Sequence, residues 1–244
     1  MIVIPMAGLS SRFKNAGYTK PKYMLEAHGK TLFNHSVSSF QKYFSSEKFL
    51  FIALDVNDTY EFIRSECLSL GINDFQIVIL DEPTKGQAQT VRLGLISANI
   101  AMDESLLIFN IDTFRPGFTY PDNFDIKNVD GYLETFVGEG KNWSNILPKN
   151  EAEYSVALTA EKKEISQYCC TGLYFWRHAK DFIRVFDEYQ QTSLKDLDAG
   201  EYYIAPMYNQ MISEGADIRY SIIAPEEVIF CGIPAEYEFF IKNN

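Results

Sequence analysis

Short apolar runs alternate with helical patterns through the first half of the chain, and this alternation most restricts the fold. Four runs, which start at Ile2, Phe49, Phe75 and Leu106, have the length and composition of buried strands. Between them, apolar spacing predicts helices over residues 31–43 and 59–70 and a third that opens after Gly86. Alternating strands and helices predict an α/β fold with a mixed, mostly parallel sheet flanked by helices. Ligands bind such sheets beyond the carboxyl ends of the strands.

The second half of the chain is less regular. We expect strands over residues 131–137, 154–159, 168–176, 218–223 and 228–230. Helices are expected over residues 179–189, through Met211 to Glu214, and from Pro234 onward. The chain has no internal repeat, low-complexity tract or clear domain boundary, and 244 residues suit one large domain. We therefore predict a single domain over residues 1–244.

The chain is acidic: Lys+Arg 22 against Asp+Glu 33 gives a net charge of −11. This balance argues against nonspecific binding to nucleic acid and against binding to an anionic membrane surface. The net charge does not exclude binding of a small anionic substrate, provided that the few lysines and arginines gather in one cleft. Such a substrate favours a divalent cation in the same cleft. Apolar runs such as residues 49–54 are too short to span a bilayer, and no signal peptide is apparent. We expect a cytoplasmic protein.

The four cysteines, Cys67, Cys169, Cys170 and Cys231, have no zinc-site spacing. Reduced thiols in the core of a cytoplasmic protein are the simplest interpretation.

A loop of small residues follows the first apolar run and ends in arginine. It reads Ala7-Gly8-Leu9-Ser10-Ser11-Arg12, and Pro21-Lys22 comes ten residues later. Backbone N–H groups of such a loop approach phosphate oxygens closely, while Arg12 adds a fork of donors and Lys22 a point charge. The stretch indicates a polyphosphate site, although a tight turn followed by solvated cations is the alternative. Neither a dinucleotide fingerprint nor a Walker loop is present.

Asp112 ends the fourth apolar run and is the strongest carboxylate candidate. Mg²⁺ is typically held by one or two carboxylates together with substrate phosphates, so Asp112 is a candidate magnesium ligand. A turn or helix cap is the alternative for a lone aspartate.

Other candidates have plain structural alternatives. Gly86 lies at a loop-to-helix junction where a flat base has room, or it only starts a helix. Glu82 either accepts a hydrogen bond from a base or is solvated, and Gln87 is otherwise a surface residue. Lys162 lies in a Glu-Lys-Lys run that is by default a charged hairpin turn. Gly172 interrupts a strand, which is unfavourable unless a ligand or another group comes close.

These motifs together resemble the sugar-phosphate nucleotidyltransferases, or nucleoside-diphosphate-sugar pyrophosphorylases, which include glucose-1-phosphate thymidylyltransferases and choline-phosphate cytidylyltransferases. The loop ending in Arg12 and the Pro21-Lys22 pair match the opening of that family. Weaker matches follow in the same order: Gly86-Gln87-Ala88-Gln89, Asp112, Glu161-Lys162, Thr171-Gly172-Leu173-Tyr174-Phe175, Glu201-Tyr202-Tyr203-Ile204 and Gly232-Ile233-Pro234-Ala235-Glu236.

The resemblance implies a Rossmann-like fold with a nucleotide-binding half, about residues 1–115, and a sugar-phosphate-binding half, about residues 116–244. It implies Arg12 and Lys22 as catalytic residues and Asp112 as the Mg²⁺ ligand. Implied nucleotide-binding residues are Ala7, Gly8, Ser10, Ser11, Glu82, Gly86 and Gln87, and implied substrate-binding residues are Lys162, Gly172 and Glu201.

Three departures from the family pattern affect the site. Ser10 replaces a loop glycine, and Ile111 and Thr113 flank Asp112 where other residues are common. Cys231 takes the place of a second metal-binding aspartate. Either Glu226 or Glu227 then supplies a ligand, or Asp112 acts with phosphates and water alone.

The resemblance implies that the chain joins an NTP to a sugar or alditol phosphate, releasing pyrophosphate, for surface polysaccharide synthesis. Glu82 favours CTP or GTP weakly, and a homo-oligomer is left open. A metal-dependent glycosyltransferase is one alternative, although the chain has Asn110-Ile111-Asp112 rather than Asp-x-Asp. A non-catalytic regulatory homologue is the other, because Cys231 leaves the metal site incomplete.

Overall fold

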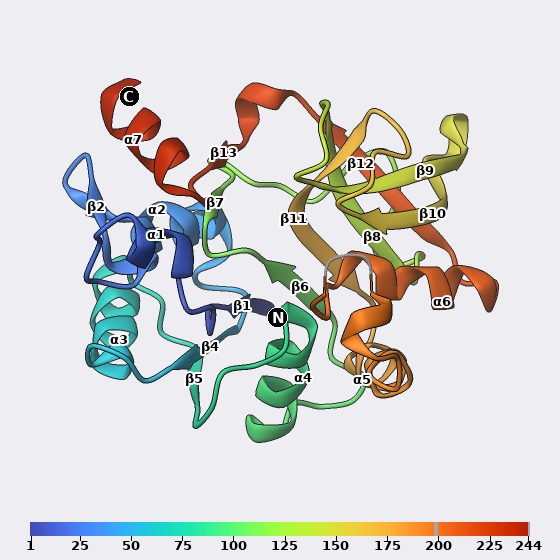
Figure 1. The fold of residues 1–244 in the computed structure, drawn as a ribbon. Coiled ribbons are helices and arrows are strands. Elements are labelled where there is room, and N and C mark those ends of the chain that lie inside the picture. The colour runs from blue at the N-terminus through green and yellow to red at the C-terminus, as the bar shows by residue number, and fades with distance from the viewer. Residues whose placement is uncertain (198–199, 244) are drawn as a thin grey trace.

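One nine-stranded sheet runs through the molecule (Figure 1). The structure, a computed structural model, describes residues 1–197 and 200–243. The strand order is β5-β4-β1-β6-β11-β8-β12-β10-β9. In chain order these strands are β1 (Ile2–Pro5), β4 (Phe49–Leu54), β5 (Phe75–Leu80), β6 (Leu106–Phe109), β8 (Gly131–Val137), β9 (Ser144–Asn150), β10 (Ser155–Glu161), β11 (Tyr168–Trp176) and β12 (Ile218–Ile223).

Helices and short strand pairs complete the fold. The α-helices are α1 (Ser11–Asn15), α2 (Leu32–Val37), α3 (Thr59–Leu70), α4 (Gln87–Ser97), α5 (Ala179–Tyr189), α6 (Tyr208–Ser213) and α7 (Pro234–Asn243). The 3₁₀ turns are Lys22–Met24, Ser38–Tyr43, Glu151–Glu153, Leu194–Asp196, Ala205–Met207 and Pro225–Glu227. Two small pairs join β2 (Glu26–Ala27) to β3 (Lys30–Thr31) and β7 (Thr113–Phe114) to β13 (Ile229–Phe230).

The first four strands of the order, β5-β4-β1-β6, are all parallel. Strands β1, β4 and β6 are buried throughout because helices cover both faces of the sheet. On one face, Val3 and Ile52 pack with Val91 of α4 and with residues of α5 and α6. On the other face, Ile4 packs with Phe33 of α2 and with residues of α3. Two-sided burial explains why these strands read as continuous apolar runs.

The second half extends the same sheet. Strand β11 pairs antiparallel with β6 and with β8, and β12 runs parallel to β8. The chain then returns to the first half, where β13 pairs with β7 and α7 lies near α1 and α2 (Figure 1). Tyr237 and Phe240 of α7 pack with Phe13 of α1. The predicted mixed α/β fold with a sheet flanked by helices is confirmed, although most strand pairings of the second half are antiparallel. The division into two binding halves stays a prediction.

Two elements differ from the sequence-based expectation. The patterns do not predict β9, which ends the strand order and contains Pro148. Asn145 and Ile146 of β9 also pair with β11, but Pro148 lies in the part that is an edge, where proline is tolerated. The helix expected over residues 31–43 ends at Val37 and continues as a 3₁₀ turn. This turn contains a non-helical Phe40, whose ring packs edge-on against Phe109 and Phe118.

All four cysteines are free and buried, as expected for core thiols. Burial raises the pKa of Cys67 and of Cys231 to about 12. Among residues 1–197 and 200–243, no helix has the length and hydropathy needed to cross a bilayer.

Helix α4 packs unusually closely against β4 at Gly94. A Cβ added there would overlap the Ile52 side chain, including its Cδ1 and Cγ1 atoms. In an open helix, alanine is favoured over glycine by roughly 1 kcal/mol. Overpacking of a core costs about 1–3 kcal/mol. We therefore expect Gly94→Ala to lower the free energy of unfolding in urea, despite its better helix propensity.

Two variants serve as controls for this packing effect. Ser97→Ala, at an exposed position of the same helix, is expected to change stability by less than about 0.5 kcal/mol. Ile52→Val removes the Cδ1 atom and should recover part of the loss when combined with Gly94→Ala. Unchanged or increased stability of Gly94→Ala alone contradicts the close contact.

Candidate active site

The loop after β1 is tied to Lys22 through Ser10. Ser10 has φ 52 and ψ 34, in the left-handed region that glycine adopts most readily. Its Oγ accepts a hydrogen bond from the Lys22 backbone N–H at 3.2 Å. The residue therefore adopts a conformation that suits glycine and makes a contact that glycine cannot make. The substitution of the expected loop glycine by serine is explained by this contact.

Lys22 and Asp112 form an ion pair at the carboxyl ends of β1 and β6. Lys22 Nζ lies 2.5 Å from Asp112 Oδ2, and the two side chains are 20% and 22% exposed. Strands β1 and β6 are parallel neighbours, so the segments that follow them meet at one edge of the sheet. The expected convergence of the first loop with Asp112 is present.

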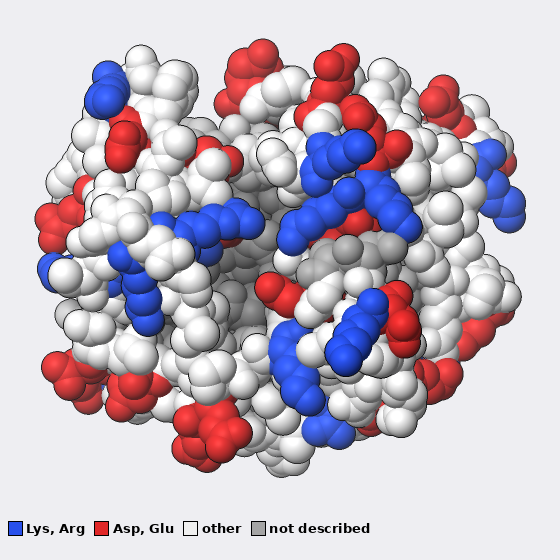
Figure 2. All heavy atoms as spheres, in the orientation of Figure 1, with Lys and Arg blue, Asp and Glu red and all other residues white. Residues whose placement is uncertain are grey.

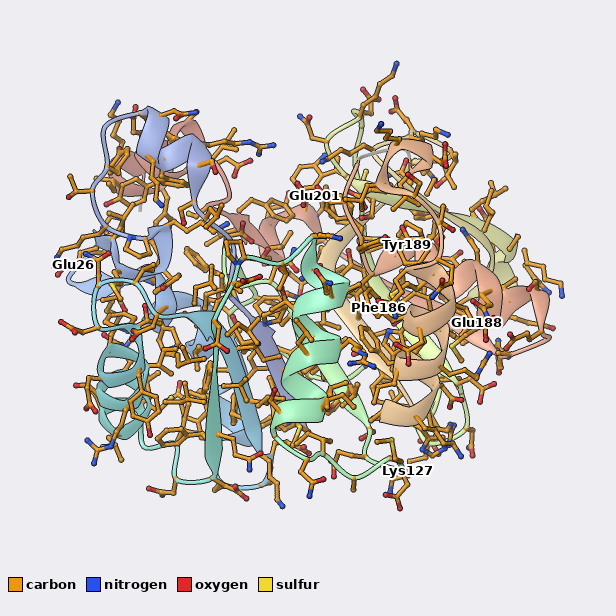
Figure 3. All side chains as sticks on the ribbon, turned by 60° about the horizontal axis from the view of Figure 1, so that its bottom comes forward. Glu26, Lys127, Phe186, Glu188, Tyr189 and Glu201 are labelled. Atoms are coloured by element: carbon orange, nitrogen blue, oxygen red, sulfur yellow. The ribbon has the colours of Figure 1, made fainter. Side chains whose placement is uncertain are left out.

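Gly86 contacts backbone from the second half of the chain. Its φ is 139, and an added Cβ would lie 2.5 Å from Tyr202 N and 2.6 Å from Tyr202 O. On either side of it, Ala88 N–H donates to Tyr202 O and Tyr202 N–H donates to Lys85 O, both at 2.9 Å. Glycine is therefore required here by a protein contact. Figure 3 shows Glu201 beside the start of α4, where these bonds form.

Gly172 also makes room for a protein group. It lies at an irregular register between Cys170 and Tyr174 of β11, with φ 95. A Cβ there would overlap the Asn110 side chain, whose Oδ1 accepts a hydrogen bond from Gln87 Nε2. The group that approaches this glycine is an amide that joins β6, β11 and α4. Asn110 was not predicted as a site residue.

Two hollows adjoin at this edge of the sheet, with volumes of about 550 and 570 Å³. The first cavity is lined by the loop of residues 5–12, by Lys22 and by residues near Gly86 and Glu201. The second cavity is lined by residues of β9, β10 and β11 and by the start of α7. Residues that line both are Arg12, Gln87, Asn110, Asp112, Tyr203 and Gly232. The face in Figure 2 is hollowed near its centre, with lysine and arginine side chains on both sides.

The predicted site residues divide between these cavities. Ala7, Gly8, Ser10, Ser11, Arg12, Lys22, Gly86, Gln87, Asp112 and Glu201 line the first. Lys162 and Gly172 line the second. Glu82 is exposed and lines neither cavity. The preference for CTP or GTP, which depended on Glu82, therefore has no support in the lining of the cleft.

Lys162 is held in the second cavity and does not lie in a solvated turn. Its ammonium donates to Tyr203 OH at 2.7 Å and lies 4.7 Å from the centre of that ring. The neighbouring Glu161 is 5% exposed and accepts a hydrogen bond from Ser144 Oγ. Burial raises the pKa of the Glu161 carboxyl. Tyr203 and Ser144 are cavity residues that the sequence alone did not indicate, because the contacts join segments distant in sequence.

The surroundings of Asp112 suit a divalent cation in part. An added Cβ at Gly232 would lie 3.0 Å from Asp112 Oδ2 and 3.6 Å from Glu236 Oε2, so two carboxylates border a space that any side chain would fill. Burial raises the pKa of the Glu236 carboxyl, and the charge of Asp112 acts in the same direction. Among the described residues, no group of three or more His, Cys, Asp or Glu side chains is placed to hold a metal.

The other residues considered for a second ligand line neither cavity. Cys231 is fully buried among Phe13, Phe114 and other apolar side chains, and its backbone N–H donates to Asp112 O at 2.8 Å. Glu227 forms an ion pair with Arg115 at 3.2 Å. Glu226 is exposed and lines neither cavity.

The comparisons with known structures agree with this geometry. The chain is 50% identical to a nucleoside-diphosphate-sugar pyrophosphorylase from Vibrio cholerae RC9, with a TM-score of 0.94 and 100% of each chain covered. An inositol-1-phosphate CTP transferase from T. maritima matches at 16% identity and a TM-score of 0.73, covering 100% of this chain and 96% of its own. An apo UDP-glucose pyrophosphorylase matches at 15% identity and a TM-score of 0.74, covering 99% and 96%. The last two likenesses show the fold alone.

No protein-family model and no curated protein sequence matches the chain. The mixed sheet and the cleft at the carboxyl ends of β1 and β6 define the Rossmann-like nucleotidyltransferase class. Identity of 50% over the full length further shows that this chain belongs to the nucleoside-diphosphate-sugar pyrophosphorylase family. The resemblance found in the sequence is thereby confirmed.

The contact between Ser10 and Lys22 predicts a difference between two substitutions. Ser10→Ala keeps the left-handed strain and loses the hydrogen bond, so the free energy of unfolding in urea should fall by about 1 kcal/mol. Ser10→Gly loses the same bond but relieves strain of roughly 1 kcal/mol, so it should be the milder change. Equal losses for the two variants would show that backbone strain at Ser10 is unimportant. Ser11→Ala is the matched control.

Proposed function

We propose that the chain transfers a nucleotidyl group from an NTP to a sugar or alditol phosphate, giving an NDP-sugar or NDP-alditol and pyrophosphate. The observation that carries this proposal is the Lys22–Asp112 pair, which stands where two cavities adjoin. Each cavity takes one substrate; Arg12 and Asp112 line both cavities, and Lys22 lines the first. A group transfer between two bound phosphates needs this arrangement, because positioning and charge stabilisation supply most of its catalysis.

The first cavity takes the NTP. The backbone of Ala7, Gly8, Ser10 and Ser11 faces the phosphates, and Arg12 stabilises the charge of the leaving pyrophosphate. Gly86, Gln87 and Glu201 lie at the far side, beside the nucleoside. Because Glu82 lies outside the lining, thermal-shift titration with the four NTPs is the direct way to identify the base.

The second cavity takes the acceptor phosphate. Lys162, held by Tyr203, neutralises this phosphate, and Gly172 lies beside the sugar or alditol. Lys22 leaves Asp112 to bridge the α-phosphate and the incoming phosphate. An acceptor oxygen then attacks the α-phosphorus in line, and the bond to the pyrophosphate oxygen breaks. No protein nucleophile is needed for this reaction.

Asp112 is the proposed Mg²⁺ ligand, and its carboxylate together with phosphate oxygens suits the preference of that ion. Bound Mg²⁺ supplies neutralisation of the charge on the triphosphate. We further propose a cytoplasmic role in supplying activated sugars or alditols for surface polysaccharide. A homo-oligomer is compatible with this proposal.

Lys22→Ala is the sharpest test of the reaction centre. Removing a preorganised donor of this kind costs roughly 3–4 kcal/mol in the transition state, so turnover should fall about a hundredfold or more. Pyrophosphate release is measured with each NTP, Mg²⁺ and a panel of sugar and alditol phosphates. Lys20→Ala, which removes an exposed cation outside both cavities, should retain activity.

The same assay separates the two alternatives. A glycosyltransferase would consume a preformed NDP-sugar without releasing pyrophosphate. A non-catalytic homologue would bind nucleotide and turn over none of the mixtures. Near-normal turnover by Lys22→Ala would remove Lys22 from the proposed role.

A further inference from the structure

We infer that Glu236 supplies the second carboxylate for the divalent cation proposed beside Asp112. This inference rests on the proposed function, because the cation enters with the nucleotide. Nothing in the sequence resemblance assigns a metal-binding role to Glu236. The positions considered for a second ligand, Cys231, Glu226 and Glu227, are excluded by their burial, exposure or ion pairing.

Glu236 is fixed at the rim of the cleft by the first turn of α7. Its Oε2 accepts hydrogen bonds from the backbone N–H groups of Gly232 at 2.8 Å and Ile233 at 3.2 Å. These two bonds hold the carboxylate against the Gly232 backbone. A Cβ built on Gly232 would lie 3.0 Å from Asp112 Oδ2 and 3.6 Å from Glu236 Oε2, so both carboxylates lie close to this one point.

The position of Glu236 also matches the path of the substrates. Glu236 lines the second cavity, and Gly232 and Asp112 line both cavities. A cation between these carboxylates therefore lies where the triphosphate and the acceptor phosphate meet. Glu161, the other carboxylate of the second cavity, is engaged with Ser144 on strand β9.

The charges of the cleft favour two carboxylates over one. In the structure the Lys22 ammonium lies 2.5 Å from Asp112 Oδ2. When phosphates draw Lys22 away, Asp112 and Glu236 together carry two negative charges, which balance one divalent cation. One or two carboxylates with phosphate oxygens and water are the usual protein environment of Mg²⁺. Glu236 Oε1 takes no part in the two backbone bonds, so the carboxylate keeps an oxygen for the cation or its water.

A purely structural role for Glu236 is the competing explanation, because its two hydrogen bonds stabilise the start of α7. Glu236→Gln separates the roles: glutamine keeps one oxygen that can accept the Gly232 and Ile233 N–H groups, but it carries no charge. The substitution should leave the thermal midpoint of unfolding nearly unchanged. It should weaken binding of a divalent cation by at least about tenfold.

The experiment measures Mn²⁺ binding to the full chain by electron paramagnetic resonance in the presence of non-hydrolysable analogues of the four NTPs, whose phosphates draw Lys22 away from Asp112. Mn²⁺ held by each analogue alone is subtracted with a protein-free control. Wild type and Glu226→Gln should bind equally, Asp112→Asn should lose binding, and Glu236→Gln should weaken it. Gly232→Ala, which puts a methyl group in tight contact with Asp112 Oδ2 and close to Glu236 Oε2, should weaken it as well and serves as the second variant if Glu236→Gln is unstable.

The outcomes distinguish this inference from the proposed function. Wild-type affinity in both Glu236→Gln and Gly232→Ala overturns the role of Glu236 and leaves nucleotidyl transfer intact if pyrophosphate is released. Absence of Mn²⁺ binding by wild type overturns the inference as well. Loss of pyrophosphate release with intact Mn²⁺ binding overturns the function and not the cation site.

Discussion

The ion pair between Lys22 and Asp112 is the interaction on which the arrangement of the cleft depends. Both side chains are about four-fifths buried, and an isolated charge in such a place is strongly unfavourable. Each charge therefore compensates the other until anionic substrates arrive. The pair forms because β1 and β6 are adjacent and parallel, which directs residues 90 apart in sequence to one edge of the sheet. The order of the strands in the sheet thus brings the Lys22 ammonium and the Asp112 carboxylate together in the cleft.

Two glycines show how the halves of the chain are held in register around that pair. Gly86 admits the Tyr202 backbone, and Gly172 admits the Asn110 amide. The Tyr202 ring in turn packs against Phe186 and Tyr189 of α5, which are labelled in Figure 3. Both contacts join the parallel β1–β6 region to the mixed second half. A Cβ at Gly86 would overlap the Tyr202 backbone, and a Cβ at Gly172 would overlap the Asn110 side chain, so either would disturb the walls of the cavities.

Periodicity predicted most of the fold. Strands β4, β5, β8, β11 and β12 and helices α3 and α5 match the expected bounds, because buried runs and amphipathic spacing are local signals. The loop with Arg12, Lys22 and Asp112 was predictable because residues at the carboxyl ends of parallel strands converge. Strand β9 was not, because residues 144–150, which include Pro148, show neither a continuous apolar run nor an alternation of apolar and polar residues.

Residues whose environment arises only from tertiary contacts were beyond prediction. Asn110, Tyr203 and Glu236 reach the cleft from segments that no short-range pattern connects. Gly86 and Gly172 were singled out correctly as unusual, but the groups that approach them belong to the protein. The position of Glu82 in a loop at the carboxyl end of a strand suggested contact with a base. The structure shows that this side chain is exposed.

The return of α7 to the first half has a consequence for how the molecule is made. Gly232 and Glu236 complete a cleft whose opposite wall is formed by residues 5–12. During translation the parallel strands β1, β4, β5 and β6 leave the ribosome long before these residues do. A growing polypeptide thus has the parallel end of its sheet available first, and its cleft can be complete only after residue 236 emerges. Nascent chains stalled before that point would lack one wall of the site.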